Sequence, residues 1–160
     1  IGKAVGGGFP LGIVASSNEI MTQWELGSHG STFGGHPVAT ATALSQLPII
    51  NNNKFLSEVN LKGDFLRTRL NKMAEKHPEI GDVRGLGLMN SIELIHPPGK
   101  KHNPELALFL HKFMLENKIL ILTCGTKKNV IRFMPPLNIE KKLLSDALDV
   151  LEAGFEKVKK

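Results

Sequence analysis

The sequence predicts an α/β fold, in which amphipathic helices alternate with short strands. Long segments with apolar residues at intervals of three and four indicate helices, and shorter β-branched or alternating runs between them indicate strands. The length of 160 residues and a hydrophobic content of 41% allow a core of useful size. The order of these elements fits an α/β or an α+β organisation.

The first fifty residues predict one strand and two helices around two glycine-rich loops. Leu11–Ser16 is short, apolar and β-branched, which favours a buried strand. Residues 18–24 indicate a short helix capped by Ser17 or Asn18. A second helix is expected from Pro37, which suits a first helical turn, to about Leu47.

A polar break at Asn51–Asn53, just after Pro48, predicts a change of element and a domain boundary. Residues 1–50 are expected to belong to a larger domain, and residues 51–160 to form a small α/β domain. The elements expected in that second part are a helix over 54–77, paired strands over 80–84 and 86–95, a helix over 103–117, strands over 119–123 and 130–134, and a helix over 140–159.

Composition excludes several classes of function. The net charge of +5 comes from scattered lysines, and only 6% of residues are aromatic, so a nucleic-acid interface is not expected. No apolar run is long enough to span a membrane, and the first residues lack the charged region, apolar stretch and cleavage site that a signal peptide would show. The single cysteine, Cys124, excludes an internal disulfide and favours a reducing compartment, so we expect a cytoplasmic protein.

The most specialised stretch is Lys-Ala-Val-Gly-Gly-Gly-Phe-Pro-Leu-Gly at residues 3–12. Three glycines allow a positive φ or a close approach of another group, and Pro10 stiffens the end of the turn. An amine in such a pocket can attack carbonyl groups once it loses its charge, as in Schiff bases with pyridoxal phosphate. A simple turn with a solvated Lys3 is the alternative.

A second glycine-rich loop occupies residues 27–37 and contains four glycines, three hydroxyl side chains and two histidines. Its free N–H groups and hydroxyls suit an anion such as phosphate. His29 and His36 lack a third ligand nearby, so no metal site is expected.

Arg132 lies between apolar neighbours in the strand predicted for residues 130–134. An arginine in such a run usually reaches solvent, but its planar, permanently charged guanidinium is also the group that best grips a carboxylate. Lys3, the loop at Gly30–Thr32 and Arg132 are therefore the candidate functional residues.

These three pieces resemble the C-terminal part of the pyridoxal-phosphate-dependent class III aminotransferases, and especially the 4-aminobutyrate aminotransferase branch. The resemblance covers nearly the whole chain, through five ordered motifs at residues 3–12, 27–37, 81–89, 122–125 and 129–137. It implies the end of the large domain and the small domain of a fold-type I transferase.

The resemblance also implies a role for each candidate residue. Lys3 corresponds to the lysine that forms the Schiff base and moves the substrate proton, and Gly30 and Ser31 to backbone contacts with the cofactor phosphate. Thr32, 29 residues after Lys3, corresponds to a threonine that reaches the phosphate of the other subunit of a homodimer. Arg132 corresponds to the arginine that binds the carboxylate of the amino-acid or 2-oxo-acid substrate.

Two positions depart from the family's pattern. His36 replaces a usual asparagine, and Pro48 interrupts a helix that usually continues. The family's fold is also considerably longer, and the chain opens with Ile1 rather than methionine, so we expect a C-terminal fragment. Because the cofactor needs the protein to orient its ring, the isolated chain is expected to lack useful transaminase activity.

The function implied is transfer of an amino group between 4-aminobutyrate, or a similar amino acid, and 2-oxoglutarate. An amino-acid racemase or aminomutase is an alternative, because the same lysine chemistry can return a proton without exchanging the amine. A non-catalytic module that associates through apolar surface at residues 11–47 is another.

Overall fold

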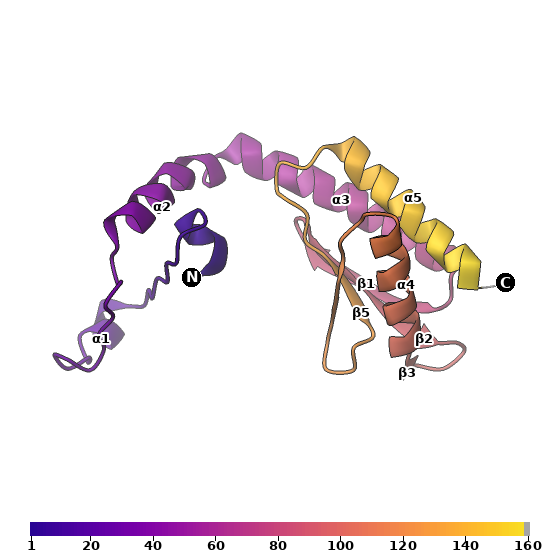
Figure 1. Cartoon of the computed structure of the whole chain (residues 1–160), viewed down its shortest axis with the longest axis horizontal. Coiled ribbons are helices and arrows are strands. Elements are labelled where there is room, and N and C mark those ends of the chain that lie inside the picture. The colour runs from indigo at the N-terminus through magenta and orange to yellow at the C-terminus, as the bar shows by residue number, and fades with distance from the viewer. Residues whose placement is uncertain (159–160) are drawn as a thin grey trace. The chain divides into compact units, whose positions relative to one another are not determined.

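The structure is a computed structural model that describes residues 1–158 and divides into two compact units. The first unit is Ile1–Leu56, and the second starts at Ser57. The predicted end of the last helix, at Lys159, lies outside the described residues. The first unit contains the short helix η1 (Lys3–Gly6) and the helices α1 (Asn18–Met21) and α2 (Pro37–Ile50), and α3 (Asn53–Lys76) begins in this unit. Figure 1 labels all of them except η1.

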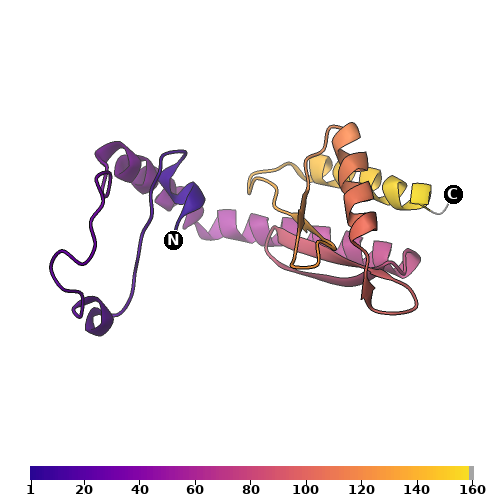
Figure 2. The same cartoon turned by 60° about the horizontal axis from the view of Figure 1, so that its bottom comes forward.

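In the first unit the glycine-rich turn packs on α2. The Thr42 hydroxyl lies within hydrogen-bonding distance of the Gly6 carbonyl oxygen, at 2.9 Å, as well as of the Val38 and Ala39 carbonyls of its own helix, at 3.0 and 2.9 Å. Gly6 is buried, as are Ala39 and Ala43 on α2. The helix α1 lies at the far end of two irregular connections, away from α2 (Figures 1 and 2). The small side chains of Ala39 and Ala43 thus allow the glycine turn to pack closely against α2.

The strand predicted at Leu11–Ser16 is wrong, because this segment is irregular and Val14 is 69% exposed. Among the described residues, the only main-chain partner of residues 11–16 outside the glycine turn is Ile1. The Ile13 N–H donates to the Ile1 carbonyl at 2.8 Å, and the Ile1 ammonium donates to the Ile13 carbonyl at 2.7 Å. A strand needs a neighbour along its length, so an apolar pattern alone does not make one.

The interruption predicted at Pro48 is also wrong, because α2 continues through it to Ile50. Proline removes one helical hydrogen bond and costs about 3 kcal/mol in a helix interior. Here it falls in the last turn, and the helix ends two residues later, at Ile50. The N–H of Asn51, the C-cap residue, donates to the Leu47 carbonyl at 2.9 Å. The change of element predicted at the asparagines is confirmed, because α2 ends at Ile50 and α3 begins at Asn53. The short helix predicted over residues 18–24 is confirmed over Asn18–Met21, but Ser17 at its N-cap makes no side-chain capping hydrogen bond.

The second unit confirms the predicted order of helices and strands. It contains β1 (Ile80–Leu86), β2 (Met89–His96), β3 (Lys101–His102), α4 (Pro104–Glu116), β4 (Leu122–Cys124), β5 (Val130–Phe133) and α5 (Lys141–Val158). The α4 helix starts as predicted, because the side-chain oxygen of Asn103 accepts a hydrogen bond from the Leu106 N–H at 2.9 Å.

The sheet of the second unit is antiparallel, in the order β1-β2-β5-β4, with β3 paired to β2. The hairpin of β1 and β2 turns at Gly87 and Leu88, slightly later than predicted. On β5, Arg132 pairs with Ser91 of β2 on one side and with Leu122 of β4 on the other. Arg132 therefore occupies a fixed position within the sheet.

One core joins the sheet to the three helices of the second unit. The apolar side chains of this core that are at most 2% exposed come from α3, β2, α4, β5 and α5. They include Leu66, Leu70, Met73, Ile92, Leu94, Leu110, Met114, Ile131, Leu148, Leu151 and Phe155. Ion pairs between Arg69 and Asp149, and between Lys76 and Glu152, also join α3 to α5. The predicted α/β class is thus confirmed: helices pack with a sheet, and the strands of that sheet are antiparallel.

Candidate functional site

Lys3 opens the short η1 helix with an exposed side chain and a strained backbone. Its φ of +59° lies in the left-handed region, which costs a non-glycine residue roughly 1–2 kcal/mol. Such strain persists only where the surroundings impose it, and it concentrates at functional sites. Lys118 and Lys128 share this conformation, so the backbone strain is not peculiar to Lys3.

Gly7 ends η1 in a left-handed conformation that glycine adopts without strain. Its φ is +60°, and its N–H donates to the Ala4 carbonyl at 3.0 Å. A Cβ at Gly7 would come within 2.1 Å of the Gln46 amide nitrogen on α2. The glycines after Lys3 therefore serve a close approach to α2, one of the two uses that the sequence indicated.

The second candidate piece, Gly30–Thr32, is exposed on an irregular loop before α2. Within residues 1–158 the hydroxyls of Ser31 and Thr32 make no hydrogen bond, and the N–H groups of the three residues donate to no carbonyl. Space around Gly30 is open, since a Cβ there would meet no heavy atom within 4 Å. These donors are therefore available to an anionic group from outside the loop.

Lys3 and the Gly30–Thr32 loop are not joined to each other within the first unit. Over the described residues, no hydrogen bond or ion pair links Lys3 to Ser31 or Thr32. Arg132 belongs to the second unit, which is described by itself. Within the first unit, Lys3 and the Gly30–Thr32 loop are thus presented by separate segments of the chain.

Arg132 is partly buried on β5, and its Nε atom is fully buried with no hydrogen-bond partner among the described residues. A buried donor without an acceptor is unfavourable by about 1–3 kcal/mol. A carboxylate is the acceptor that a guanidinium binds best, through two parallel hydrogen bonds. Arg132 is therefore chemically prepared for an anionic ligand.

An apolar cavity of about 430 Å³ lies beside Arg132. Its walls come from residues 119–122, from residues 132–139 and from the inner faces of α4 and α5. The sequence analysis missed this cavity. The available signal is the pair of apolar segments Ile119–Leu122 and Met134–Pro136, whose pattern predicts only a strand and a strand end.

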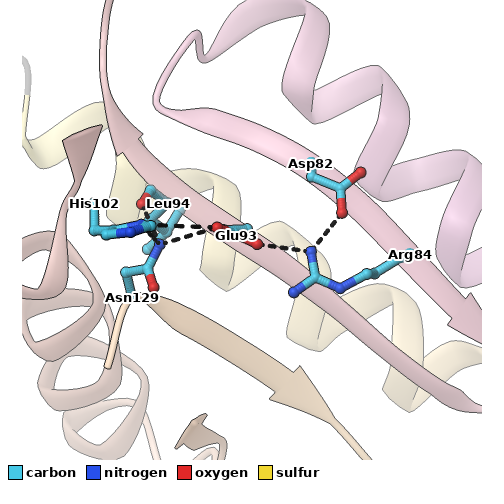
Figure 3. A network of polar contacts seen from close by, with 6 residues as sticks. All are labelled: Asp82, Arg84, Glu93, Leu94, His102 and Asn129. Carbon is cyan, nitrogen blue, oxygen red and sulfur yellow. Dashed lines mark hydrogen bonds and ion pairs between the residues drawn. The ribbon is translucent and has the colours of Figure 1, made fainter. Parts of the chain in front are cut away.

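A polar network connects side chains of β1, β2 and β3 with Asn129, the residue before β5 (Figure 3). Glu93 on β2 accepts a hydrogen bond from Arg84 at 2.9 Å and lies 3.8 Å from His102. Asn129, only 2% exposed, donates to the Leu94 carbonyl at 2.9 Å. The network ties β1, β2 and β5 together. The hydrogen bond from the Arg84 guanidinium to Asp82 raises the pKa of Arg84 above its usual value.

Comparison with known proteins identifies the family to which these sequence motifs belong. The family Aminotransferase class-III matches residues 1–155, almost the whole chain. The chain belongs to the class III aminotransferases. The resemblance drawn from the sequence motifs is thereby confirmed, and so is the fold class.

Three similar proteins illustrate the range of this family. A 5-aminovalerate aminotransferase of Pseudomonas aeruginosa is 39% identical over 98% of this chain and 37% of its own length. A 4-aminobutyrate aminotransferase of Escherichia coli is 36% identical over the same shares. The solved acetylornithine aminotransferase of Elizabethkingia anophelis is 33% identical, with a TM-score of 0.77 over 98% of this chain and 38% of that one.

This class III aminotransferase chain therefore spans a little over a third of the length of the curated relatives it matches. Members of the family use pyridoxal phosphate. The residues present fit part of that cofactor's needs, because the chain offers an exposed amine at Lys3 and free hydroxyl and N–H donors at Ser31 and Thr32 for a phosphate.

Two other findings concern the described residues only. No group of three or more His, Cys, Asp or Glu side chains within residues 1–158 is arranged to hold a metal ion. No helix in the same range combines the length and the hydropathy that a membrane span requires.

Proposed function

We propose that this chain forms the C-terminal part of a pyridoxal-phosphate-dependent aminotransferase that exchanges an amino group between an ω-amino acid, such as 4-aminobutyrate, and 2-oxoglutarate. The observation that carries the proposal is the buried, unpartnered Nε of Arg132 in a chain that matches the family over residues 1–155. This nitrogen lacks a hydrogen-bond acceptor, and the carboxylate of a substrate could supply one.

Lys3 is proposed to hold the cofactor through its amine and then to move a proton at the substrate carbon that carries the amino group. The exposure of Lys3 and its constrained, left-handed backbone support this role. Pyridoxal phosphate, when bound, draws electrons away from that carbon. The lysine then acts as the acid and base at short range.

Gly30, Ser31 and Thr32 are proposed to bind the cofactor phosphate of a partner subunit in a homodimer. Their free N–H and hydroxyl groups, and the absence of any bond to Lys3 within residues 1–158, support a role at another chain's site. Residues 1–50 would then belong to the large domain, and residues 51–160 to the small domain. A cytoplasmic location is part of the same proposal.

The amino donor is the least constrained part of the proposal. The relatives named above are 5-aminovalerate, 4-aminobutyrate and acetylornithine aminotransferases, and each donor carries its amine at the end of a chain. We favour 4-aminobutyrate from the motifs of the sequence. A direct comparison of these three donors therefore forms part of the test.

The test uses the protein at its natural length and measures glutamate formed from 2-oxoglutarate with each of the three donors. Arg132→Lys keeps the charge but loses the planar fork, so we expect KM for 2-oxoglutarate to rise at least about tenfold. Arg69→Lys, at an ion pair between α3 and α5, is the matched control and should leave that KM unchanged.

Two results would contradict the proposal. One is consumption or interconversion of the amino donor that does not require 2-oxoglutarate, which would instead indicate a racemase or aminomutase. The other is an equal effect of both arginine variants on KM. The 160-residue chain on its own is expected to form no glutamate, because the residues that orient the cofactor ring are not among the candidates found here.

A further inference from the structure

The side-chain amide of Asn129, a buried residue just before β5, faces three acceptors with two hydrogens. Its Nδ2 atom lies 2.9 Å from the Leu94 carbonyl oxygen, 3.3 Å from Nδ1 of His102 and 3.5 Å from Oε1 of Glu93. The Leu94 carbonyl takes one hydrogen, at the shortest distance. His102 and Glu93 therefore compete for the other (Figure 3).

His102 accepts this hydrogen in only one of its charge states. A neutral imidazole accepts through the nitrogen that carries no proton, whereas a protonated imidazole only donates. The bond from Asn129 to Nδ1 therefore requires a neutral His102 with its proton on Nε2. When Nδ1 is protonated, two N–H groups face each other and this bond is lost.

Glu93 on β2 supplies the acceptor that the protonated form needs. Its Oε1 atom lies 3.8 Å from Nδ1 of His102, and its Oε2 atom accepts a hydrogen bond from Arg84 at 2.9 Å. The carboxylate is thus held in place by Arg84, with its other oxygen beside His102 (Figure 3). Hydrogen bonds between charged groups are shorter and stronger than neutral ones, so protonation draws His102 towards Glu93.

Four further ionisable groups surround His102. They come from β2, β3, α4 and the turn before β5, and they line one open pocket with it: His96, Lys101, Glu105 and Lys127. The two lysines oppose a positive charge on His102, and Glu105 favours it. Within residues 1–158, the ion pairs and side-chain hydrogen bonds of His102 involve only Glu93 and Asn129. These two residues therefore decide how His102 responds to a proton.

The Leu94 main chain connects this group to three elements. Its N–H donates to the Asn129 carbonyl at 2.8 Å, and its carbonyl accepts from the N–H of Asn103 at 3.0 Å. Asn103 is the N-cap of α4, and His102 pairs with Ile95 where β3 meets β2. An added bond between His102 and Glu93 therefore fastens β3 and the start of α4 to β2.

We propose that His102 is a proton-controlled switch between two partners. In the neutral state it accepts a hydrogen bond from Asn129. In the protonated state it donates from Nδ1 to Glu93 and holds β3 and the start of α4 more firmly on β2. The inference is independent of the proposed function, because it uses no residue assigned to the cofactor or the substrate.

The first experiment determines which ring nitrogen of His102 carries the proton. Histidine ring 15N chemical shifts are recorded for the protein at its natural length at about pH 8 and about pH 5, the two ends of the range in which histidine changes charge. His102→Gln assigns the signal. We expect Nδ1 to be unprotonated at the higher pH and protonated at the lower one. A proton on Nδ1 at the higher pH would overturn the proposal, because Asn129 then has no acceptor in His102.

The second experiment measures the attachment of β3 by hydrogen exchange and mass spectrometry of residues 99–103, corrected for the intrinsic effect of pH. Protection should be about two- to fivefold greater at about pH 5 than at about pH 8, the gain expected of a partly exposed ion pair. Glu93→Gln keeps the size of the side chain but removes its charge. It should abolish this difference, as should His102→Gln.

Two matched variants control for indirect effects. Asp82→Asn removes the other carboxylate of Arg84, and His96→Gln removes the histidine that lies 3.9 Å from Glu105 in the same pocket. Both should keep the difference in protection between the two pH values. A difference that survives in Glu93→Gln, or that disappears equally in Asp82→Asn and His96→Gln, would show that His102 and Glu93 do not form the switch.

Discussion

The Arg67 guanidinium on α3 donates a hydrogen bond to the side-chain oxygen of Asn90, at the start of β2, at 3.0 Å. Asn90 is only 1% exposed, and its amide nitrogen donates to the Gly87 carbonyl at 2.8 Å. Arg67 donates to the same carbonyl at 3.1 Å. These bonds fix the β1–β2 hairpin to α3, one residue before Ser91, which pairs with Arg132.

Asn90→Leu should therefore destabilise the second unit. It removes both hydrogen bonds of the Asn90 side chain and takes one of the acceptors of Arg67, which keeps the Gly87 carbonyl and Asp64. We therefore expect a loss of about 1–3 kcal/mol in the free energy of unfolding. Urea unfolding followed by circular dichroism measures this. Asn71→Leu, an exposed asparagine on α3, is the control, and a loss of the same size there would refute the hairpin role.

Gly63 on α3 marks the second contact between this helix and the hairpin. A Cβ at Gly63 would lie 2.0 Å from the Gly87 carbonyl oxygen, which is backbone and has little room to move. Gly63→Ala should therefore lower the free energy of unfolding by about 1–3 kcal/mol, although alanine normally stabilises a helix relative to glycine. The sign of the change decides the matter, and a gain in stability would show that the contact is loose.

The glycine turn that carries Lys3 depends on α2 through Thr42. Thr42→Val removes the hydrogen bond to the Gly6 carbonyl but keeps the side-chain shape, so we expect the turn at residues 3–8 to open more often. Hydrogen exchange at the Gly7 and Phe9 amides should speed up by about tenfold at most. Thr40→Val, on the same helix but with bonds only inside it, should leave that exchange unchanged.

The ion pair between Lys76 and Glu152 predicts a pH dependence at the alkaline end. The hydrogen bond from Lys76 to Glu152, 2.7 Å long, raises the pKa of Lys76 above its usual value of 10.5. Because the folded-state pKa is the higher one, this stabilisation is complete below the unfolded pKa. It is lost as the pH rises through the folded value.

The free energy of unfolding, measured from about pH 9 to about pH 12, should therefore fall, and the part that Lys76 contributes should vanish in Lys76→Met. The effect is small, since both groups reach solvent. Lys72→Met, an exposed lysine of the same helix, should keep the slope of the parent chain. An identical slope for Lys76→Met and the parent would contradict the assignment.

The predictions from sequence succeeded where local pattern decides the structure. The period of α3, the asparagine cap of α4 and the glycine turn between β1 and β2 are properties of short segments, and each formed within a few residues of its predicted place. They failed where distant partners decide. Leu11–Ser16 has the pattern of a strand but lacks a neighbour beyond Ile1, and Pro48 is tolerated because the helix ends soon after it.

The candidate residues divide in the same way. Lys3 was found through its glycine neighbours, which also account for its turn, and Arg132 through its apolar strand. The cavity next to Arg132 depends on where β4 and β5 separate, and no local pattern records that point. The hydrogen bond from Arg67 to Asn90 joins residues 23 positions apart, and the sequence alone does not predict it either.

The central claim is that Lys3 holds the cofactor, and the most direct test is to locate the attachment chemically. The protein at its natural length is incubated with pyridoxal phosphate and reduced with borohydride, and the modified peptide is identified by mass, with Lys3→Ala as the control. We predict a single modified residue, Lys3, and its loss in the variant. Attachment at another lysine, or spread evenly over many lysines, would contradict the account.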